Sequence, residues 1–334
     1  MSAVFDRLDH QAREKLEAVE QPEWVEPMLA KLTDDPFSDP GWIYERKVDG
    51  ERCLAFRRGD AVRLLSRNQE SLNIQYPELE KALLKTAPER FVLDGEVVAF
   101  EGDVTSFSQL QERMHVNSRA EAQDSGVSVY YYLFDILYLS DHKITKVPLR
   151  QRKRLLKHAF DFQDPLRFLS HRNETGKSYF EEACRKGWEG VIAKQADWPY
   201  VHSRSSKWLK FKCVSRQEFV IGGYTEPHGE RIAFGALLIG YYEDEQLVYA
   251  GKVGTGYDDD TLRRLGERLG ELEQEDPPFA DGDLPGKDVH WVRPRLVAEI
   301  GFSEWTDYGK LRHPRYLGLR QDKEPQDVHR EQPP

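Results

Sequence analysis

The sequence has few cysteines and no long apolar run. Its three cysteines, Cys53, Cys184 and Cys213, are scattered and form no C-x-x-C pair, so we expect neither a disulfide framework nor a structural zinc site. No apolar run approaches the ~20 residues that span a bilayer, and residues 1–20 are charged where a signal peptide would be apolar. These absences predict a soluble protein of the cytoplasm that does not enter a membrane.

A surplus of positive charge is also missing, because 48 lysines and arginines accompany 58 aspartates and glutamates, a net charge of −10. Affinity for a nucleic-acid backbone comes largely from lysine and arginine, so the sum argues against such a partner. The distribution argues for one, since residues 204–216 contain five basic and no acidic residues, and residues 310–323 contain five basic residues with only Asp322. Either run alone fits a solvated surface, but both contain aromatic residues, as phosphate-contacting strands do: Trp208, Phe211 and Tyr316.

The length of 334 residues, with 39% apolar and 11% aromatic residues, predicts two domains with buried cores. Residues 1–22 have leucines at helical intervals among charged residues, which predicts an N-terminal extension with a short solvent-exposed helix. Residues 23–214 mix strands and helices without a regular βαβ alternation, which favours an α+β domain. Residues 324–334 are polar and are expected to form a disordered tail.

Residues 215–323 are predicted to form a second, smaller domain. The strands and the helix of this domain are expected at residues 218–224, 235–242, 246–253, 260–272 (the helix), 292–302 and 316–320. Five short strands with one helix are the pattern of an OB-fold β-barrel, which is a common platform for nucleic acid.

Residues 45–52, with the sequence Glu-Arg-Lys-Val-Asp-Gly-Glu-Arg, place Lys47 among carboxylates where a predicted strand meets a turn. An unprotonated lysine amine can attack the α-phosphate of a nucleoside triphosphate and carry the nucleotide as a phosphoramidate. Asp49 can hold a metal ion, Gly50 allows backbone to approach the nucleotide, and Arg52 offers a planar donor fork to ribose or phosphate. A charged strand-to-turn segment is the alternative interpretation, because a lone K-x-D-G pattern is short.

Further short blocks follow this segment along the chain. They are Ser66-Arg67-Asn68, Leu93-Asp94-Gly95-Glu96, Leu133-Phe134-Asp135-Ile136-Leu137, Glu189-Gly190-Val191-Ile192-Ala193-Lys194, Lys207-Trp208-Leu209-Lys210-Phe211-Lys212 and Arg320-Gln321-Asp322-Lys323. This order resembles the ATP-dependent DNA ligases, within the superfamily of lysine-adenylating nucleotidyltransferases that also contains RNA ligases and mRNA capping enzymes. The likeness covers about residues 25 to 325.

Within that family, the segments at residues 219–224, 249–256 and 311–320 are similar to the ligase module of bacterial DNA ligase D. The resemblance implies that residues 23–214 form an adenylation domain with antiparallel sheets and that the OB-fold domain follows it. NAD-dependent ligases of the family carry a four-cysteine zinc module, which this sequence lacks.

The resemblance implies that Lys47 takes AMP from ATP. It further implies that Glu45 recognises adenine, that Phe134 stacks on the base, and that Arg52 and Arg67 contact ribose or phosphate. The reaction requires an unprotonated amine, although a free lysine has a pKa near ~10.4. We therefore expect the surroundings of Lys47, including a bound cation, to favour its neutral form.

Carboxylates and two further lysines complete the expected site. Family ligases use the positions of Glu96 and Glu189 for the ribose hydroxyls and for a divalent metal, and these oxygens, with Asp49, suit Mg²⁺ or Mn²⁺. A surface salt bridge is the alternative role for a single glutamate. Lys210 and Lys212 point to the same face of a strand, because successive side chains alternate, and both can reach the α-phosphate.

Arg320 and Lys323 match the last ligase motif, which the resemblance places on the OB-fold domain, where it orients the departing pyrophosphate. This implies that the OB-fold domain closes over the ATP pocket and then opens to hold nicked DNA, with a hinge within residues 213–218. Two positions depart from the family pattern. Gln69 stands where family members commonly have glycine, and Ser140-Asp141-His142 replaces a usual Asp-Gly turn.

We therefore predict an ATP-dependent DNA ligase that seals 5′-phosphate/3′-hydroxyl breaks in nicked or broken double-stranded DNA through a lysyl-AMP intermediate. The resemblance to the ligase D module implies DNA repair by end joining, a monomer at the nucleoid, and separately encoded polymerase, nuclease and Ku-like end-binding partners. An RNA ligase or a GTP-dependent capping-type enzyme is the nearest alternative. A non-catalytic DNA-binding protein is the other, but it would not need Lys47 between Glu96 and Glu189.

Overall fold

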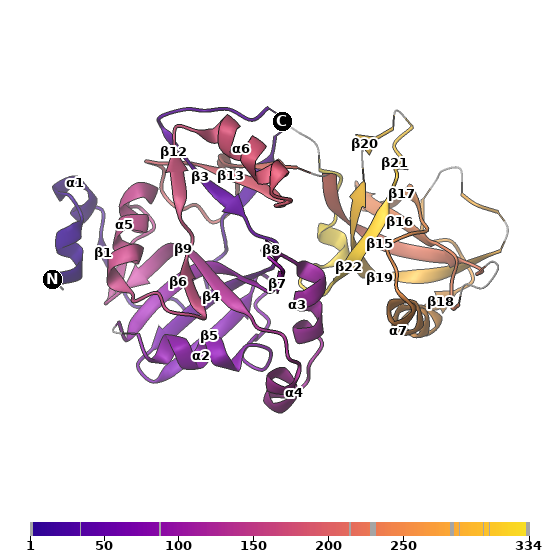
Figure 1. Cartoon of the computed structure of the whole chain (residues 1–334), viewed down its shortest axis with the longest axis horizontal. Helices are drawn as coiled ribbons and strands as arrows, with labels where there is room; N and C mark the ends of the chain where they lie inside the picture. The colour runs from indigo at the N-terminus through magenta and orange to yellow at the C-terminus, as the bar shows by residue number, and fades with distance from the viewer. Residues whose placement is uncertain are drawn as a thin grey trace. The chain divides into compact units, whose positions relative to one another are not determined.

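The computed structural model describes residues 3–33, 35–86, 88–213, 215–227, 232–280, 284–286, 288–302, 304–306 and 308–331. The chain divides after Cys213 into two compact units. In these residues the first unit contains two large sheets, a two-stranded sheet and most of the helices, and the second contains one large sheet (Figure 1). None of the helices in these residues is long and apolar enough to cross a membrane.

The large sheet of the first unit is almost entirely antiparallel. Its strands, in spatial order, are β1 (Glu17–Ala18), β10 (His142–Lys143), β9 (Tyr130–Leu139), β6 (Arg90–Val98), β4 (Glu51–Arg58) and β5 (Ala61–Ser66), and β11 (Leu166–Phe168) pairs with β9 in parallel. The middle strands are apolar without alternation, because both faces of the sheet are covered. In β9 every residue from Leu133 to Leu139 is buried.

The small sheet of the first unit carries the lysine motif. Its strands, in spatial order, are β12 (His171–Asn173), β3 (Trp42–Lys47), β13 (Gly190–Gln195), β14 (Arg204–Lys212) and β2 (Leu29–Leu32). All pairs are antiparallel except β14 with β2. The mixture of antiparallel sheets and separate helices confirms the α+β prediction for this half of the chain.

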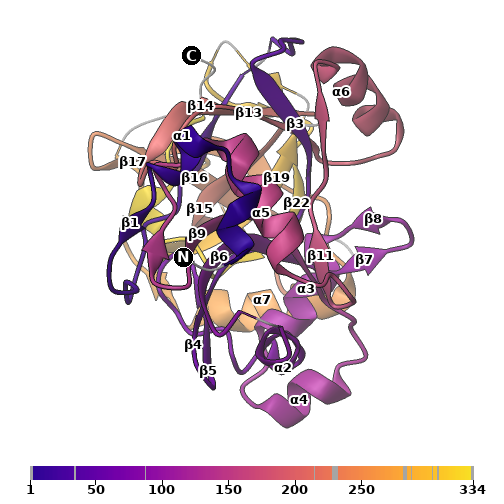
Figure 2. The same ribbon diagram turned by 90° about the vertical axis from the view of Figure 1, so that its left-hand side faces the viewer.

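Helices cover the outer faces of the two sheets. They are α2 (Pro77–Leu84), α3 (Phe107–Met114), α4 (Arg119–Asp124), α5 (Leu149–Ala159) and α6 (Gly176–Arg185), and β7 (Phe100–Glu101) pairs with β8 (Val104–Thr105) beside α3. Helix α5 packs on β9, and α6 packs on β3 and β13 (Figure 2). One apolar cluster lies between the large sheet and its helices, and another lies between the two sheets, including Leu54, Phe56, Val92, Phe134 and Trp208.

The N-terminal segment is not the solvent-exposed helix that the sequence predicted. It forms a 3₁₀ turn (η1, Ala3–Arg7) and a short α1 (His10–Arg13), and then β1 pairs with β10. Phe5 and Leu8 are buried in the core of the large sheet, and η1 packs beside α5 (Figure 2). The charge pattern was misleading because three apolar side chains, Phe5, Leu8 and Ala12, suffice to dock so short a segment.

The turn after β5 carries Arg67 and is closed by Ser66. The Ser66 hydroxyl accepts hydrogen bonds from the backbone N–H groups of Asn68 (3.2 Å) and Glu70 (3.1 Å), and Ser66 and Glu70 also pair through their backbones. Gln69 has φ 68°, so it adopts the left-handed conformation that glycine adopts without strain. The backbone at position 69 therefore has a conformation that suits the family's glycine, although the residue here is glutamine. The Ser140-Asp141 turn behaves likewise, with φ of 45° and 66°.

The second unit is a curled sheet with one flanking helix. The strands of this sheet, in spatial order, are β17 (Gln246–Val253), β16 (Leu237–Glu243), β15 (Ser215–Thr225), β19 (Val289–Phe302) and β18 (Glu273–Gln274), and β22 (Arg315–Arg320) also pairs with β19. A separate pair is formed by β20 (Glu304–Trp305) and β21 (Leu311–Arg312). The flanking helix is α7 (Asp259–Gly270), and a 3₁₀ turn, η2 (Pro325–Asp327), follows the last strand. Bulges interrupt the register of β15, β16 and β19, and such bulges bend strands and increase their twist. This unit matches the predicted OB-fold pattern, with additional short strands that the sequence did not indicate.

The C-terminal segment is ordered as far as the structure describes it, which corrects the prediction of a disordered tail. Val328 is buried in the core of the second unit, and its carbonyl accepts a hydrogen bond of 2.7 Å from the Tyr242 backbone. His329 bridges to Tyr242 and accepts a bond from Gln217 through its carbonyl oxygen. Residues 332–334 of the predicted tail lie outside the described residues.

Two of the cysteines are bonded, contrary to the expectation from their spacing. Cys184 of α6 and Cys213, directly after β14, form a disulfide with Cα atoms 5.1 Å apart. The pairing arises because α6 packs on β13 and β13 pairs with β14, so residues 29 positions apart in sequence meet. Cys53 is buried in the large sheet and is not disulfide-bonded.

We predict that Leu8→Ala destabilises the first unit by about 2–4 kcal/mol, because the substitution leaves a cavity in the core against which η1 packs. Urea unfolding followed by tryptophan fluorescence measures the loss. The control is Glu14→Ala, an exposed residue of the same segment, which should change stability by less than about 0.5 kcal/mol. Equal, small effects of the two changes would mean that the segment does not pack as described.

We predict that Gln69→Gly raises the stability of the first unit by about 1 kcal/mol, because glycine removes the cost of the left-handed backbone. The gain is seen as a higher midpoint in urea unfolding. Gln69→Ala removes the same exposed side chain but keeps a Cβ, so it should give no such gain. If the glycine variant is no more stable than the alanine variant, the backbone at residue 69 is not strained.

Candidate active site

Two neighbouring strands bring the proposed nucleophile and a carboxylate together. Lys47 is the last residue of β3, and its register partner is Gly190, the first residue of β13. Gly190 has φ 154°, and a Cβ at this position would lie 1.9 Å from the Phe211 carbonyl oxygen. Glycine is therefore required for β13 to pair with β14 here, and Glu189 enters the site directly before it.

The Lys47 amine contacts the Glu189 carboxylate. Nζ of Lys47 lies 2.5 Å from Oε2 of Glu189, and the two side chains are 22% and 4% exposed. The amine is thus close to the surface of the site, whereas the carboxylate is buried behind it. This contact brings together the lysine segment and the Glu189 block, which are 142 positions apart in the chain.

The described side chains, in the absence of the bound cation that the expectation included, favour the charged form of Lys47. Burial alone would lower the pKa of Lys47, but the negative charges of Glu189, Glu96 and Asp49 outweigh it, and the pKa is raised. The basic strand β14 does not reverse this balance. Activation of the amine therefore has to come from something that binds at these carboxylates.

The register of the small sheet places Lys210 and Lys212 on the face that carries the nucleophile. Lys212 pairs with Gly190, which pairs with Lys47, and Lys210 pairs with Ile192, which pairs with Glu45. Because side chains alternate along a strand, the lysines of β14 and the two charged residues of β3 point to the same side. The expectation of a shared face is confirmed by this register.

Arg52 does not present an open donor fork, because its guanidinium is bound by a carboxylate. Its Nε and NH2 groups donate to the two oxygens of Asp94 at 2.5 and 2.6 Å, and NH2 also donates to the Met28 carbonyl oxygen at 3.2 Å. Tyr200 donates to Asp94 at 2.7 Å and accepts from the Met28 N–H at 2.8 Å. The four residues form a closed ring of hydrogen bonds that fixes Arg52 between the sheets.

Asp94 is a residue that the sequence analysis quoted in a motif without giving it a role. It lies two residues before Glu96 on β6, and Glu96 is the register partner of Arg52 on β4. This spacing was the available signal, since alternate residues of a strand share a face. Glycine is needed at position 50 for a different reason from the one expected. A Cβ there would lie 2.1 Å from the Val97 carbonyl oxygen, so the close approach is to β6.

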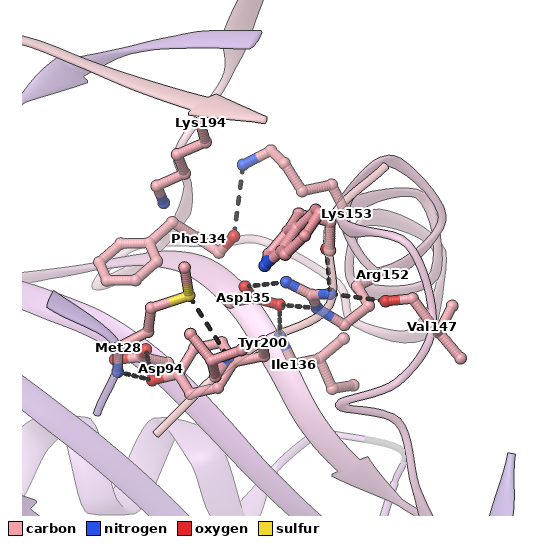
Figure 3. Close-up of polar contacts among 12 residues, drawn as sticks. Met28, Asp94, Phe134, Asp135, Ile136, Val147, Arg152, Lys153, Lys194 and Tyr200 are labelled. Carbon is pink, nitrogen blue, oxygen red and sulfur yellow. Dashed lines mark hydrogen bonds and ion pairs between the residues drawn. The ribbon is translucent and has the colours of Figure 1, made fainter. Parts of the chain in front are cut away.

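Phe134 lies between the sheets among aromatic and cationic groups. Its ring is edge-on to Trp208 with centroids 6.1 Å apart. The Lys194 amine lies 4.1 Å and the Arg52 guanidinium 4.7 Å from the ring centroid. Figure 3 shows Lys194 pointing toward this ring from the small sheet. Aromatic faces attract cations as well as bases, so this cluster is where a purine could be held.

A buried ion pair anchors the strand that carries Phe134 to helix α5. Arg152 donates to both oxygens of Asp135 at 2.7 and 2.8 Å, and neither side chain is exposed (Figure 3). Asp135 also accepts from the Ile136 N–H, and Arg152 donates to the Val147 carbonyl oxygen at 2.6 Å. The ion pair therefore also holds the next residue of the helix, Lys153, next to the backbone of Phe134.

Glu45 is fully buried and is paired with two lysines that the sequence analysis did not single out as site residues. Lys153 donates to one of its oxygens, and the Lys194 amine lies 2.6 Å from the other. Lys194 ends the Glu-Gly-Val-Ile-Ala-Lys block and was quoted without a role. Lys153 had no motif signal, because its place depends on how α5 packs.

Three carboxylates could hold a metal ion. Oxygen atoms of Asp49 and Glu189 lie within 4.8 Å of each other, both residues being buried. Glu96, half-buried on β6, acts on Lys47 electrostatically together with them. Their oxygen donors suit a hard divalent cation, and such a cation would offset the negative charge that raises the pKa of Lys47. The donor set therefore fits Mg²⁺ or Mn²⁺.

The remaining predicted residues are one arginine of the first unit and two basic residues of the second unit. Arg67 is half-buried in the turn after β5. In the second unit, Arg320 donates to both oxygens of Asp322 at 2.8 and 2.7 Å, and Lys323 pairs with Glu218 at 3.1 Å. Within their own unit, these two basic residues are therefore held by acidic neighbours.

We predict that Asp94→Asn destabilises the first unit by about 3 kcal/mol, because it leaves the largely buried charge of Arg52 without a carboxylate partner. Urea unfolding measures the loss. Glu23→Gln is the control, since Glu23 also pairs with arginines but is 67% exposed, and exposed pairs contribute less than about 1 kcal/mol. If the two substitutions cost the same, the Arg52–Asp94 pair does not hold the site together.

Comparisons with known proteins agree with this geometry. The family model described as "ATP dependent DNA ligase domain" matches residues 27–212, and that of the "ATP dependent DNA ligase C terminal region" matches residues 230–323. The chain is 38% identical over 321 residues to the multifunctional non-homologous end joining protein LigD of Pseudomonas aeruginosa, covering 93% of this chain and 37% of that protein.

A multifunctional non-homologous end joining DNA repair protein LigD of Mycobacterium tuberculosis is 37% identical over 296 residues, covering 87% of this chain and 37% of its own length. The chain thus spans little more than a third of these relatives. A solved structure of mycobacterial DNA ligase D complexed with ATP and MES is similar with a TM-score of 0.67 and 34% identity, covering 92% of this chain and 98% of that one. The chain therefore belongs to the family of ATP-dependent DNA ligases, as its ordered motifs predicted.

Proposed function

We propose that the protein seals 5′-phosphate/3′-hydroxyl breaks in double-stranded DNA by carrying AMP on Lys47. The observation that supports this most directly is the Lys47–Glu189 contact of 2.5 Å at one end of the space between the sheets, near the other motif carboxylates. A protein that only binds DNA has no use for an amine held among three carboxylates. A lysine nucleophile for phosphoryl transfer needs both the amine and the means to neutralise phosphate charge.

The proposed reaction has three steps. The neutral amine of Lys47 attacks the α-phosphorus of ATP, the N–P bond forms, and the bond to the β-phosphate oxygen breaks, so pyrophosphate leaves with that electron pair. A 5′-phosphate oxygen of DNA then displaces the lysine and takes the AMP. Finally a 3′-hydroxyl attacks the activated 5′-phosphate, which forms the phosphodiester and releases AMP.

Asp49, Glu96 and Glu189 would hold the divalent cation that this family is expected to need. A cation bound there supplies positive charge, which favours the neutral amine and stabilises the charge that develops on the phosphates. The residues of the chain do the rest. Glu189 Oε2 lies 2.5 Å from Nζ of Lys47. Glu189 is therefore proposed to orient the amine as well as to bind the cation.

The other side chains are proposed to bind and orient the nucleotide. Phe134 stacks on the base, and Glu45 reads its edge. The basic groups bind ribose or phosphate, and they are Arg52 of β4, Arg67 of the turn after β5, Lys210 and Lys212 of β14, and Arg320 and Lys323 of the second unit. The last pair would act on the departing pyrophosphate when the OB-fold unit closes. For Arg52, this requires contact through the edge of a guanidinium already fixed by Asp94.

We place this activity in end joining, because the relatives with 37–38% identity are named for it. Those proteins are much longer than the matched region. We propose that the protein acts as a monomer in the cytoplasm, at the nucleoid, together with polymerase and nuclease activities and a Ku-like end-binding protein. Co-purification with such candidates from cells is the test of the partners.

We predict that ATP labelled at the α-phosphate, with Mg²⁺, leaves one AMP on Lys47, located by peptide mass spectrometry. Lys47→Arg should carry no label, because a guanidinium does not lose its proton. Lys81→Arg, a change at an exposed helix residue, should label normally. Chelation of divalent cations with EDTA should abolish labelling.

The same assay separates the alternatives. Adenylated protein should then seal nicked DNA, and an RNA ligase would prefer nicked RNA, whereas a capping-type enzyme would take GTP in place of ATP. An unlabelled wild-type protein that is folded and supplied with ATP and Mg²⁺ contradicts the proposal.

A further inference from the structure

Lys153 is a buried charge for which neither the motifs nor the proposed reaction has a use. It lies in the middle of α5, is 1% exposed, and belongs to a helix whose other polar residues mostly face outward. Burying an ammonium group is costly unless it is paired and hydrogen-bonded. The residue must therefore be explained by what its amine contacts.

The three donors of the Lys153 amine have three acceptors. One is the Glu45 carboxylate, one is the Leu169 carbonyl oxygen at 2.9 Å, and one is the Phe134 carbonyl oxygen at 3.4 Å. Figure 3 shows the contact with Phe134. An ammonium has three N–H groups, so each has a partner. Lys153 thus joins β3, which carries Glu45, to the backbone of β9 at the residue proposed to stack on the base.

Lys194 holds Glu45 from the other side. Its amine lies 2.6 Å from Oε2 of Glu45 and also lies over the rings of Phe134 and Trp208 at 4.1 and 4.0 Å. Both oxygens of the carboxylate are therefore tied to cations. A side chain held at both oxygens cannot change rotamer without breaking a buried ion pair, which is costly.

The surroundings keep Glu45 ionised. Burial alone would raise the pKa of Glu45, but the charges of Lys153 and Lys194 outweigh it and the pKa is lowered. A cavity of about 340 Å³ lies beside Lys153, and its lining contains basic residues and no carboxylate: Arg150, Lys153, Arg154, Lys157, His158 and His171. Burial and the nearby Lys153 charge lower the pKa of His171 to about 4, so this imidazole is neutral at pH 7.

A fixed carboxylate discriminates between the two purine nucleotides by what they present to it. An ionised carboxylate only accepts hydrogen bonds. Adenine has an N–H donor on its 6-amino group, whereas guanine has an acceptor oxygen at that position and donors at N1 and its 2-amino group. A carboxylate that could shift along the edge would reach the guanine donors, so discrimination depends on holding Glu45 in place.

We propose that Lys153 is a positioning residue for base selection, which locks the Glu45 carboxylate relative to the Phe134 stacking position so that the site accepts adenine and rejects guanine. The inference rests on the proposed function and adds to it a residue and a specificity. Lys153 touches no substrate atom in this account and acts through Glu45 alone.

The test compares self-adenylation with self-guanylylation in single-turnover experiments, with ATP and GTP each varied over a wide concentration range. In Lys153→Met, which keeps length and removes the charge, the preference for ATP over GTP should fall by roughly tenfold to 100-fold. That is the equivalent of the ~1.5–3 kcal/mol that a hydrogen bond to a charged group contributes. The change should be in half-saturating concentrations, with the rate at saturating ATP within about threefold, because the reacting groups are untouched.

The matched control is Lys157→Met, one turn further along the same helix, where the side chain is exposed and is not paired with Glu45. It should keep the full preference for ATP. If Lys153→Met does not fold, Lys194→Met removes the other ion pair of Glu45 and should lower the ATP preference in the same direction. An unchanged preference in either folded variant overturns the proposal.

A double substitution separates positioning from a general structural role. In a Glu45→Gln background, Lys153→Met should cause no further change in the ATP-to-GTP ratio, because the group it positions has been removed. Additive effects would mean that Lys153 acts elsewhere and would overturn the inference. A wild-type protein that is labelled by neither nucleotide would instead contradict the proposed function, so the two failures are distinguishable.

Discussion

The site depends on the pairing of opposite charges that are buried between two sheets. Charged groups in such a place are stable only when each has a partner at hydrogen-bond distance. The structure meets this condition with pairs that each join two different elements of the fold: Arg52 with Asp94, Arg152 with Asp135, Glu45 with Lys153 and Lys194, and Lys47 with Glu189. The pairs therefore do two things, since they make the charges tolerable and fix the distances between the elements.

This constraint also determines what fills the space between the two sheets. The apolar cluster that includes Leu54 and Trp208 fills one part of the space between the sheets, and the charged groups occupy the rest. The negative charges of Glu189, Glu96 and Asp49 raise the pKa of Lys47, so in the proposed reaction a bound cation would have to favour the neutral amine.

The sequence predicted the parts of the site that depend on strand phase and motif order. Lys210 and Lys212 share a face because they are two apart in a strand, and Lys47 meets Glu189 because β3 pairs with β13. The strands of the second unit were predicted within a few residues, since their apolar runs are bounded by turn residues. The shared face and the strand positions follow from local pattern, whereas the meeting of Lys47 with Glu189 was implied by the resemblance of the ordered motifs.

What the sequence did not predict depends on tertiary contact. The roles of Asp94 and Lys153 follow from which residues face them across the fold, and periodicity carries no such information. The N-terminal helix and the C-terminal tail were expected to be exposed because they are polar on average, yet single buried residues such as Leu8 and Val328 dock them. The Cys184–Cys213 bond likewise joins residues that only the packing of α6 on β13 brings together.

The most direct test of the account is the chemical nature of the bond between the protein and AMP. The protein is incubated with ATP, freed of nucleotide, and treated with acid or with alkali before the released AMP is measured. A phosphoramidate on an amine should release AMP in acid and keep it in alkali. Release in alkali with stability in acid would indicate an ester or acyl linkage and would contradict the assignment of Lys47 as the carrier.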